Sequence, residues 1–260
     1  MSTSTALLEP PRVALDADAR PRLVRLTGVE LRKMVDTRAG FWLQLAVLAV
    51  AITALVLLAV FGHGDDHAIR NTLAVAIWPA GVLLPVVGIL LVTSEWSQRT
   101  TLITFTIVPQ RLRVLVSKVM AGTVLAVIAF AAGLVLAAPV TAAIGSGLER
   151  QWSLPPALLG QDLLFVVIAM ITGIGFGAML LSSAPAIVLS FALPIGWSAL
   201  GSISVFTGTA GWLDGGRSYA PMVDHVMSGT EWARVATTLA LWMLLPLAIG
   251  TWRIARNEIS

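Results

Sequence analysis

Six long apolar stretches constrain this chain more than any other feature of its sequence. A helix needs about 20 apolar residues to cross the hydrocarbon core of a bilayer, and each stretch reaches that length. None has a charged residue near its middle, where one charge costs about 2.5–3.5 kcal/mol of insertion free energy. The pattern predicts an all-α integral membrane protein with six transmembrane helices, at residues 39–61, 71–93, 118–144, 161–181, 185–206 and 233–252.

The composition agrees with lipid as the main surroundings of the chain. Hydrophobic residues make up 57% of it and charged residues only 12%, against about 25% charged residues in a typical soluble domain. The net charge of +3 does not indicate nucleic-acid binding, because the basic residues lie beside apolar stretches. Cysteine is absent, which excludes disulfides, thiolate catalysis and cysteine-bound metals.

Residues 22–38 show a helical periodicity of a different kind. Leucine, valine and methionine share one broad arc of the helix, and most charged side chains lie opposite. Such a basic amphipathic helix is expected to lie in the membrane interface, with its cations toward anionic headgroups; a solvated helix that only flanks the first span is the alternative. Glu30 does not fit this pattern. The cations are Arg22, Arg25, Arg32, Lys33 and Arg38.

The Lys and Arg residues are distributed unevenly. Thirteen of the 17 fall before the first span, around the connection of spans two and three, or after the last span. The positive-inside rule places these segments in the cytoplasm, so both termini are expected there. The excess of Arg over Lys is typical of a GC-rich bacterial genome, and the expected location is a bacterial plasma membrane. Residues 1–21 are predicted to be a disordered tail, residues 39–256 the six-helix domain, and residues 257–260 a short C-terminal tail.

Only Ser182, Ser183 and Ala184 separate the fourth apolar stretch from the fifth. One helix through both would be about twice as long as the membrane is thick. Serine is favoured at a helix start and proline at the first helical position. We therefore predict a tight turn, with Pro185 as the first residue of the fifth span.

Glycines and prolines recur inside the spans. Gly173 and Gly177 form a Gly-x-x-x-Gly spacing that permits close helix approach, and we expect a packing contact there rather than a substrate site. Pro79 and Pro85 both lie in the second span, where each frees a backbone carbonyl and can kink the helix. They are candidate hinges, although static kinks would use the same residues.

The residue patterns of enzymes are missing. No predicted span contains a histidine, and the chain has no Gly-Lys pair, so the phosphate-binding loop of ATPases is absent. Asp65, Asp66 and His67 could bind a surface cation, but a solvated turn is the better interpretation. We expect no catalytic residue, no metal site and no cofactor in this chain.

The connection between spans two and three, at residues 94–117, is unusually apolar for a loop. Leu102, Ile103, Phe105 and Val108 would be costly in water unless they are buried against the protein or a partner. Pro109 disfavours helix at the residue before it, which separates a short element from the start of span three. The loop is interpreted as a docking surface; a re-entrant bend packed on its own helices is the alternative.

Two segments resemble a known family. The runs ELRKMVDTRAGFW, at residues 30–42, and SEWSQRTTLITFTIVPQRLRVLVSK, at residues 94–118, are similar to the permease subunits of type-2 ABC transporters, an exporter-type class with six spans. Many relatives carry glycine between the two arginines after the loop proline, where this chain has Leu112. The resemblance implies a permease paired with a second copy or a related permease, each docked on a separate ATPase subunit that binds ATP and Mg.

The resemblance also implies roles for particular segments. Residues 22–38 would be the connecting helix, spans two and five would line the substrate path, and residues 207–231 would cap it. The loop after span two would carry the coupling helix, at about residues 98–108. The residues expected to couple the chain to the ATPase are Glu95, Arg99, Thr100, Leu102, Ile103, Phe105 and Val108.

The uncharged spans favour an amphiphilic or hydrophobic cargo for such an exporter. Two other classes of function remain open. A non-transporting scaffold or anchor would have the same spans, and an intramembrane or lipid-modifying enzyme would need a polar group of residues within them. An adjacent gene for a cytosolic ATPase would favour the transporter, and its absence would favour the scaffold.

Overall fold

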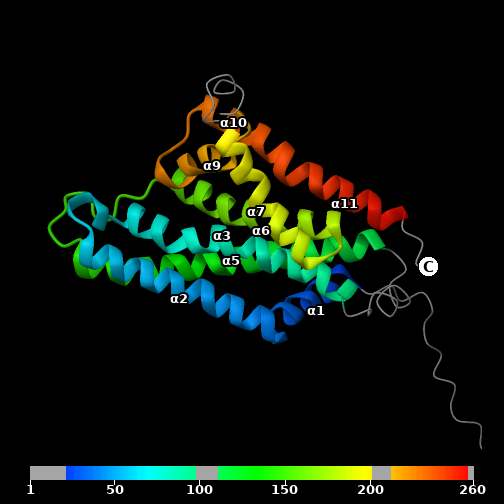
Figure 1. Cartoon of the computed structure of the whole chain (residues 1–260). Helices are drawn as coiled ribbons and strands as arrows, with labels where there is room; N and C mark the ends of the chain where they lie inside the picture. The colour runs from blue at the N-terminus through cyan, green and yellow to red at the C-terminus, as the bar shows by residue number, and fades with distance from the viewer. Residues whose placement is uncertain (1–21, 98–110, 201–211, 257–260) are drawn as a thin grey trace, which may run out of the picture.

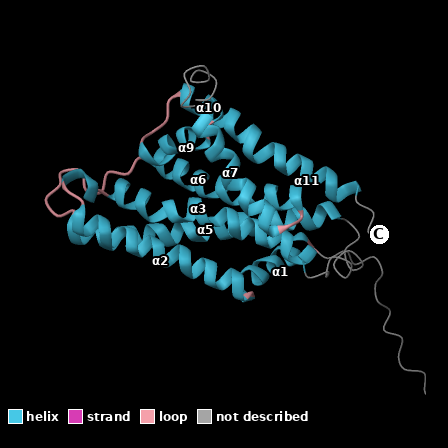
Figure 2. Cartoon of the chain, in the orientation of Figure 1, coloured by secondary structure: helices cyan, strands magenta, loops and turns pink. Residues whose placement is uncertain are grey.

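A computed structural model describes residues 22–97, 111–200 and 212–256 of the 260 residues. Every regular element in these ranges is helical (Figures 1 and 2). Six helical segments are long and apolar enough to cross a membrane. The expectation of an all-α, multi-pass membrane protein is therefore confirmed.

The spans are formed by a small number of long helices. The first three are α2 (Arg38–Phe61), α3 (Ile69–Ser97) and α5 (Arg111–Ile144). The next two are α6 (Pro156–Leu180) and α7 (Ser183–Leu200), and the sixth is the continuous run of α10 (Gly229–Leu239), η2 (Ala240–Leu244) and α11 (Leu245–Arg256). Outside the spans lie α1 (Leu23–Asp36), the 3-10 turn η1 (Gly64–His67) and α9 (Gly215–Asp224).

The amphipathic helix and the first span are separated by a single residue. Thr37 has an extended backbone, and its hydroxyl accepts a hydrogen bond from the Gly40 N–H at 3.2 Å. This is the arrangement of an N-cap, which satisfies one of the free amides at a helix start. Arg38, expected at the end of the interfacial helix, is therefore the first residue of α2.

Helix α6 lies at the centre of the bundle. It contacts α3, α5, α7, α9 and α11, and 14 of its residues are buried. Helix α2 lies along one edge of the bundle (Figure 1). Only three residues of α2 and two of α7 are buried. The core consists mainly of side chains from α3, α5 and α6, including Leu73, Ile77 and Met170.

The turn between α6 and α7 differs in detail from the prediction. The two spans are separate helices, as expected, and Leu181 turns the chain with a left-handed backbone (φ 53°). The next helix already begins at Ser183, so Pro185 is its third residue rather than its first. Proline is tolerated there because the first amides of a helix have no intrahelical acceptor. The expected end of this span, beyond Leu200, lies outside the described residues.

The sixth span contains a π-helical segment. The N–H of Leu245 donates to the carbonyl of Ala240, five residues earlier. Pro246, which follows, has no N–H to donate, and a local change of hydrogen-bond pattern is a common response to such a residue. The indole Nε1 of Trp242, within the segment, donates to the carbonyl of Leu213 at 2.8 Å.

Candidate functional site: a buried ion-pair cluster

The bundle has two ends, which are named here by the helices found there. The α1 end holds α1, the end of α3, the start of α5, the turn between α6 and α7, and the end of α11. The α9 end holds η1, the connection of α5 to α6, α9 and the start of α10 (Figure 1). Residues 98–110 connect α3 to α5 at the α1 end and lie outside the described residues, so Arg99, Thr100, Leu102, Ile103, Phe105 and Val108 stay predictions.

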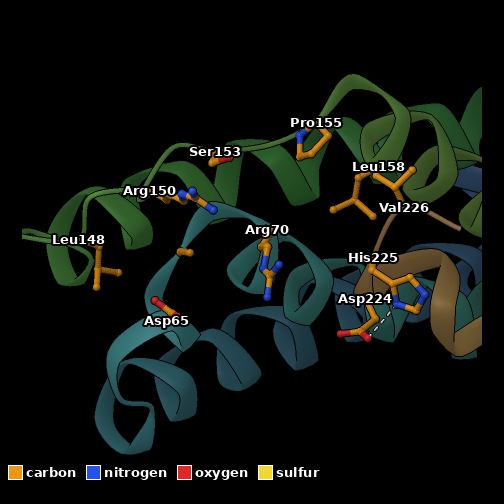
Figure 3. A pocket seen from close by; sticks show the side chains of 11 residues that line it. Asp65, Arg70, Leu148, Arg150, Ser153, Pro155, Leu158, Asp224, His225 and Val226 are labelled. Carbon is orange, nitrogen blue, oxygen red and sulfur yellow. Dashed lines mark hydrogen bonds and ion pairs between the residues drawn. The ribbon is translucent and has the colours of Figure 1, made fainter.

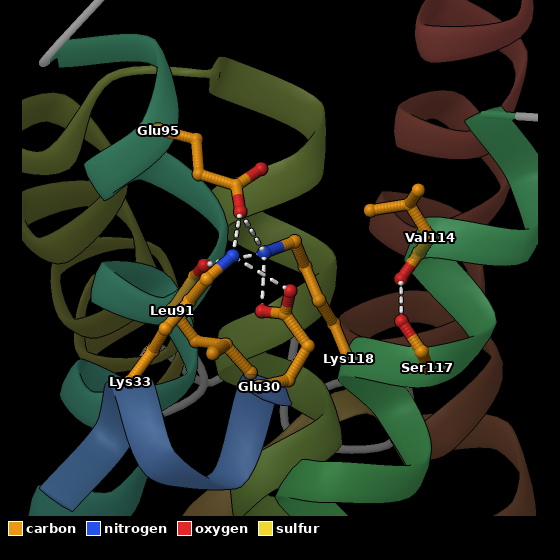
Figure 4. A network of polar contacts seen from close by, with 7 residues as sticks. All are labelled: Glu30, Lys33, Leu91, Glu95, Val114, Ser117 and Lys118. Atoms are coloured by element: carbon orange, nitrogen blue, oxygen red, sulfur yellow. Dashed lines mark hydrogen bonds and ion pairs between the residues drawn. The ribbon is translucent and has the colours of Figure 1, made fainter. Parts of the chain in front are cut away.

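Four charged side chains meet at the α1 end (Figure 4). The ammonium Nζ of Lys118 lies 2.7 Å from Glu30 Oε2 and 3.0 Å from Glu95 Oε1. The Nζ of Lys33 lies 2.9 Å from Glu30 Oε1 and 2.7 Å from Glu95 Oε1. We call these four residues the charge cluster. Two cations face two anions, so the cluster has no formal net charge.

Helical spacing explains how the charge cluster assembles. On α1, Thr27, Glu30 and Met34 are the buried residues, and their spacing of three and four places them on one face of the helix. Glu30 therefore points inward. On α3, Glu95 follows Leu91 by one turn, and Lys118 of α5 also donates to the Leu91 carbonyl at 3.1 Å.

Burial determines how much free energy is lost when one member of the charge cluster is removed. The side chains of Lys118, Glu30 and Glu95 are 4%, 6% and 9% exposed. An ammonium has three N–H donors, and Lys118 has three oxygen acceptors in hydrogen-bonding range. Removing one partner from a buried ion pair leaves an uncompensated charge, which is strongly destabilising. The cluster therefore fixes α1 against α3 and α5.

Lys33 closes the charge cluster toward the solvent. Its side chain is 40% exposed. Partial burial opposes its charge, but the hydrogen bonds to Glu95 and Glu30 outweigh that effect, so the pKa of Lys33 lies above its usual value. Lys33 was expected among the cations at the lipid headgroups, and instead its ammonium lies between two carboxylates. Arg22, Arg25, Arg32 and Arg38 are exposed, as a headgroup role requires.

Further polar contacts connect the other helices at the α1 end. The hydroxyls of Thr93 on α3 and Ser183 on α7 lie 2.7 Å apart. Arg253 of α11 donates from Nη1 to the carbonyl of Met179 on α6 at 2.7 Å. At this end, the charge cluster thus connects α1 with α3 and α5, and the two further contacts connect α3 with α7 and α6 with α11.

Sequence reasoning reached only part of this site. It named Glu95 and Lys33, but it took Glu30 as an exception to the apolar arc and Lys118 only as one more basic residue beside a span. The available signal was that an acid on the inner face of an amphipathic helix needs a buried cation as partner. The sequence could not identify that cation, because Glu30 and Lys118 are 88 residues apart.

Gly173 and Gly177 lie where α6 packs against the backbone of α3. A Cβ on Gly177 would lie 3.1 Å from the Ile89 Cα, and one on Gly173 would collide with the backbone of Pro85. On α3, a Cβ on Gly88 would lie 2.7 Å from the Met170 carbonyl oxygen. The glycines thus remove side chains from a backbone-to-backbone contact. Pro79 and Pro85 both lie within the single helix α3, and their role as hinges stays a prediction.

At the α9 end, α6 carries two buried polar residues side by side. The amide nitrogen of Gln161 donates to the carbonyls of Met222 (3.1 Å) and His225 (2.7 Å), and its oxygen accepts from the Met227 N–H (3.0 Å). This fixes the connection of α9 to α10. Asp162 is 1% exposed, and its Oδ1 has no hydrogen-bond partner among the described residues. An ionisable residue in a span is a functional candidate, which sequence analysis did not single out.

A pocket of about 360 Å³ opens at the same end (Figure 3). Its lining includes Asp65, Arg70, Arg150 and His225, contributed by η1, the start of α3, the α5–α6 connection and the end of α9. Asp65 belongs to the predicted solvated turn, which the structure forms as η1. The Asp66 carboxylate accepts from the His63 N–H at 3.1 Å. Within the described ranges, no group of three or more histidine and acidic side chains is placed to hold a metal ion.

His225 connects α9 to α10 at the rim of this pocket. Its Nδ1 lies 3.1 Å from Asp224 Oδ2 and its Nε2 lies 2.9 Å from Glu231 Oε1. The hydrogen bonds to Asp224 and Glu231 raise the pKa of His225 above its usual value. Glu231 also accepts from the Ser228 N–H at 2.7 Å and so caps α10.

The class that the fold defines is an all-α, multi-pass membrane protein with a buried charge cluster where its amphipathic helix meets the second and third spans. No model of a known protein family matches the chain, and no curated protein is significantly similar to it.

Proposed function

We propose that this chain is the membrane-spanning permease subunit of an ATP-driven exporter of the type-2 ABC class. The observation that carries the proposal is the charge cluster at the base of the 98–110 segment. A permease driven by a separate ATPase needs a docking loop that is connected rigidly to the spans, so that movement of the loop also moves the spans. Glu95 near the end of α3 and Lys118 in the third turn of α5 lie on the two sides of that segment and meet through their side chains.

The proposed mechanism follows from this connection. Two ATPase subunits bind ATP and Mg and close on each other, and Leu102, Ile103 and Phe105 carry the movement from the ATPase surface. Glu95 and Lys118 transmit it to α3 and α5, and Glu30 and Lys33 transmit it to α1. Two permeases, either copies of this chain or this chain and a related one, would then exchange an inward-facing packing for an outward-facing one.

The proposed substrate is amphiphilic or hydrophobic, and its path lies between the two permeases. Among the residues of α7 only Ala186 and Ser190 are buried, so the fifth span has a free face for a second permease or for cargo. Helix α3 is much more buried within the chain itself. Exposure therefore supports the fifth span as a path-lining helix more strongly than the second.

The proposed location is a bacterial plasma membrane, with both termini and the α1 end in the cytoplasm. Exposed Arg22, Arg25 and Arg32 lie on α1, and cytoplasmic segments beside spans carry the excess of Lys and Arg. This orientation would place the 98–110 segment where a cytosolic ATPase can reach it.

Co-purification with an ATPase tests the proposal. The chain is expressed with the ATPase encoded beside it, and the complex is isolated in detergent through a tag on the chain. Leu102→Asp and Phe105→Asp should lose the ATPase while the chain still inserts, because a carboxylate cannot be buried in an apolar docking groove without a partner. Gln110→Asp, which adds the same charge to the same connection, is the matched control.

Three results would contradict the proposal. They are unchanged co-purification of both Asp variants, ATP hydrolysis by the purified chain alone, and a wild-type complex whose ATPase rate does not respond to any amphiphile in lipid nanodiscs. The first result would contradict the role of Leu102 and Phe105 in coupling, and either of the others would contradict the assignment of the chain as a permease.

A further inference from the structure

An apolar groove of about 350 Å³ runs along the side of the bundle, between α2 and α5. Val35, Phe41, Leu45 and Leu48 lie on one wall, and Ile128 and Ala132 lie on the other. Gln44 also lines the groove, and its side-chain amide donates to the Met34 carbonyl at 3.1 Å. Val35 belongs to α1, and Leu84, which also lines the groove, belongs to α3. Because the other lining residues belong to the first and third spans, the groove faces lipid rather than water.

The groove lies within one leaflet. Arg38, Phe41, Leu45 and Leu48 follow one another at spacings of three and four residues, so they form one stripe along α2. From Phe41 to Leu48, the part of the stripe that lines the groove, the helix rises about 10 Å, at about 1.5 Å per residue. With Arg38, one turn before the groove, the stripe spans about 15 Å, which is half of a hydrocarbon core about 30 Å thick.

The mouth of the groove carries the features of a membrane interface. Arg38, the first residue of the stripe, is exposed. The rings of Phe41 and Trp42 lie edge to face with centroids 5.9 Å apart and are largely exposed. Exposed aromatic side chains at the end of a span favour headgroup depth. A cation thus lies at headgroup level, one helical turn before the first α2 residue of the apolar groove.

We propose that the groove binds one acyl chain of an anionic phospholipid whose phosphate contacts Arg38. A guanidinium pairs with phosphate through two parallel N–H···O bonds, and the apolar walls accommodate the chain. Exposed Arg25 and Arg32 on the neighbouring helix α1 add positive potential at the same surface, which favours an anionic headgroup over a zwitterionic one. This inference is independent of the proposed transport function.

Native mass spectrometry of the full chain tests the site. The protein is reconstituted in nanodiscs of phosphatidylglycerol and phosphatidylethanolamine, released into mild detergent, and analysed for retained lipid. The wild type should retain one phosphatidylglycerol. Ala132→Phe should lose it because the ring occupies the groove. Arg38→Gln should reduce the preference for phosphatidylglycerol about fivefold, the effect of one basic residue near an anionic surface.

Two matched variants serve as controls. Ala131→Phe adds the same ring to an exposed position one residue away on α5 that does not line the groove. Arg70→Gln removes one charge from an exposed position at the α9 end, far from the groove. Both should retain lipid as the wild type does.

Retention of phosphatidylglycerol by Ala132→Phe, or an unchanged preference in Arg38→Gln, would overturn the proposal. A second copy of the chain is the competing occupant. Because the chain has no cysteine, Leu48→Cys gives a single thiol in the groove. Efficient disulfide formation between two copies through that thiol would assign the groove to a dimer interface and exclude the lipid.

Discussion

Lys118 shows at the scale of one residue how a membrane protein can keep a cation at the edge of a span. Its side chain is 4% exposed, and its ammonium has three oxygen acceptors. Lys33 forms ion pairs with the same two carboxylates from a side chain that is 40% exposed. The two lysines therefore carry the same charge, but water can replace the ammonium of Lys33 more easily than that of Lys118.

Replacing Lys118 should accordingly cost much more than replacing Lys33. We expect Lys118→Met to lower the free energy of unfolding by about 3–5 kcal/mol, because Glu30 and Glu95 stay buried with one cation fewer. Lys33→Met should cost clearly less, since the Lys33 side chain is itself 40% exposed, so water can take the place of its ammonium. Unfolding of both variants in mixed micelles by denaturant titration measures the difference.

A double variant separates this effect from simple loss of packing. Adding Glu30→Gln to Lys118→Met should recover part of the lost free energy, because it removes a charge that the first change leaves uncompensated. If the two effects are strictly additive, the two side chains do not form the ion pair described here.

His225 should make the contact of α9 with α10 depend on pH. Its raised pKa means that the folded form binds the proton more tightly than the unfolded chain. The stabilisation is therefore fully present below the unfolded pKa of about 6.5 and is lost as the pH rises through the folded value. Amide hydrogen exchange at the start of α10, measured from pH 5 to 9 and corrected for intrinsic rates, should show protection falling across that window.

His225→Gln should abolish this change, whereas His63→Gln, at an exposed position of the same end, should retain it. Equal pH dependence in the two variants would show that another group controls the contact.

At the scale of elements, the contact of α6 with α3 depends on residues that lack a side chain. Gly160, in the same helix α6, has no neighbouring atom within reach of an added Cβ. An alanine at Gly160 therefore changes helix propensity without a collision. Comparing it with an alanine at Gly173 tests whether the glycines of the contact are needed for close packing or affect only helix propensity.

Gly173→Ala should destabilise the fold by about 1–3 kcal/mol, because the added methyl group forces the backbones apart. Gly160→Ala should be neutral or stabilising by up to about 1 kcal/mol, as expected for alanine in place of glycine in a helix. Thermal unfolding in detergent distinguishes the two. A Gly173→Ala variant as stable as the wild type would mean that α3 and α6 can move apart without a loss of stability.

The sequence was sufficient to predict the helices but not the contacts between them. Apolar runs of about 20 residues identified all six spans, because a lipid-facing helix must satisfy this length locally. The start of α7 was wrong by two residues, since Leu181 makes the turn with a backbone conformation that favours glycine. The meeting of Glu30 with Lys118 depends on how α1, α3 and α5 pack, which no local pattern records.

At the scale of the whole molecule, the two ends should lie on opposite sides of the membrane. The absence of cysteine allows single thiols to be introduced at exposed positions. Gly64→Cys and Gly216→Cys at the α9 end should react with a membrane-impermeant maleimide in intact cells. Ser182→Cys, at the α1 end, should react only after the membrane is opened. The reverse pattern would contradict the proposed orientation.

The π-helical segment of the sixth span has a consequence for insertions and deletions. The buried residues of this span are Val235, Thr238, Trp242, Pro246, Gly250 and Ile254. Four successive steps of four residues would rotate an ordinary α-helix by about 160°.

The wider π-helical turn takes up about one residue, or 100° of that rotation. Thr238, which hydrogen-bonds to Ser218, and Gly250, which packs against Ala178, can therefore both face the bundle. Deleting a single residue between Ala240 and Leu244 would put the two halves of the span out of phase. Substitutions in the same segment would leave that phase intact.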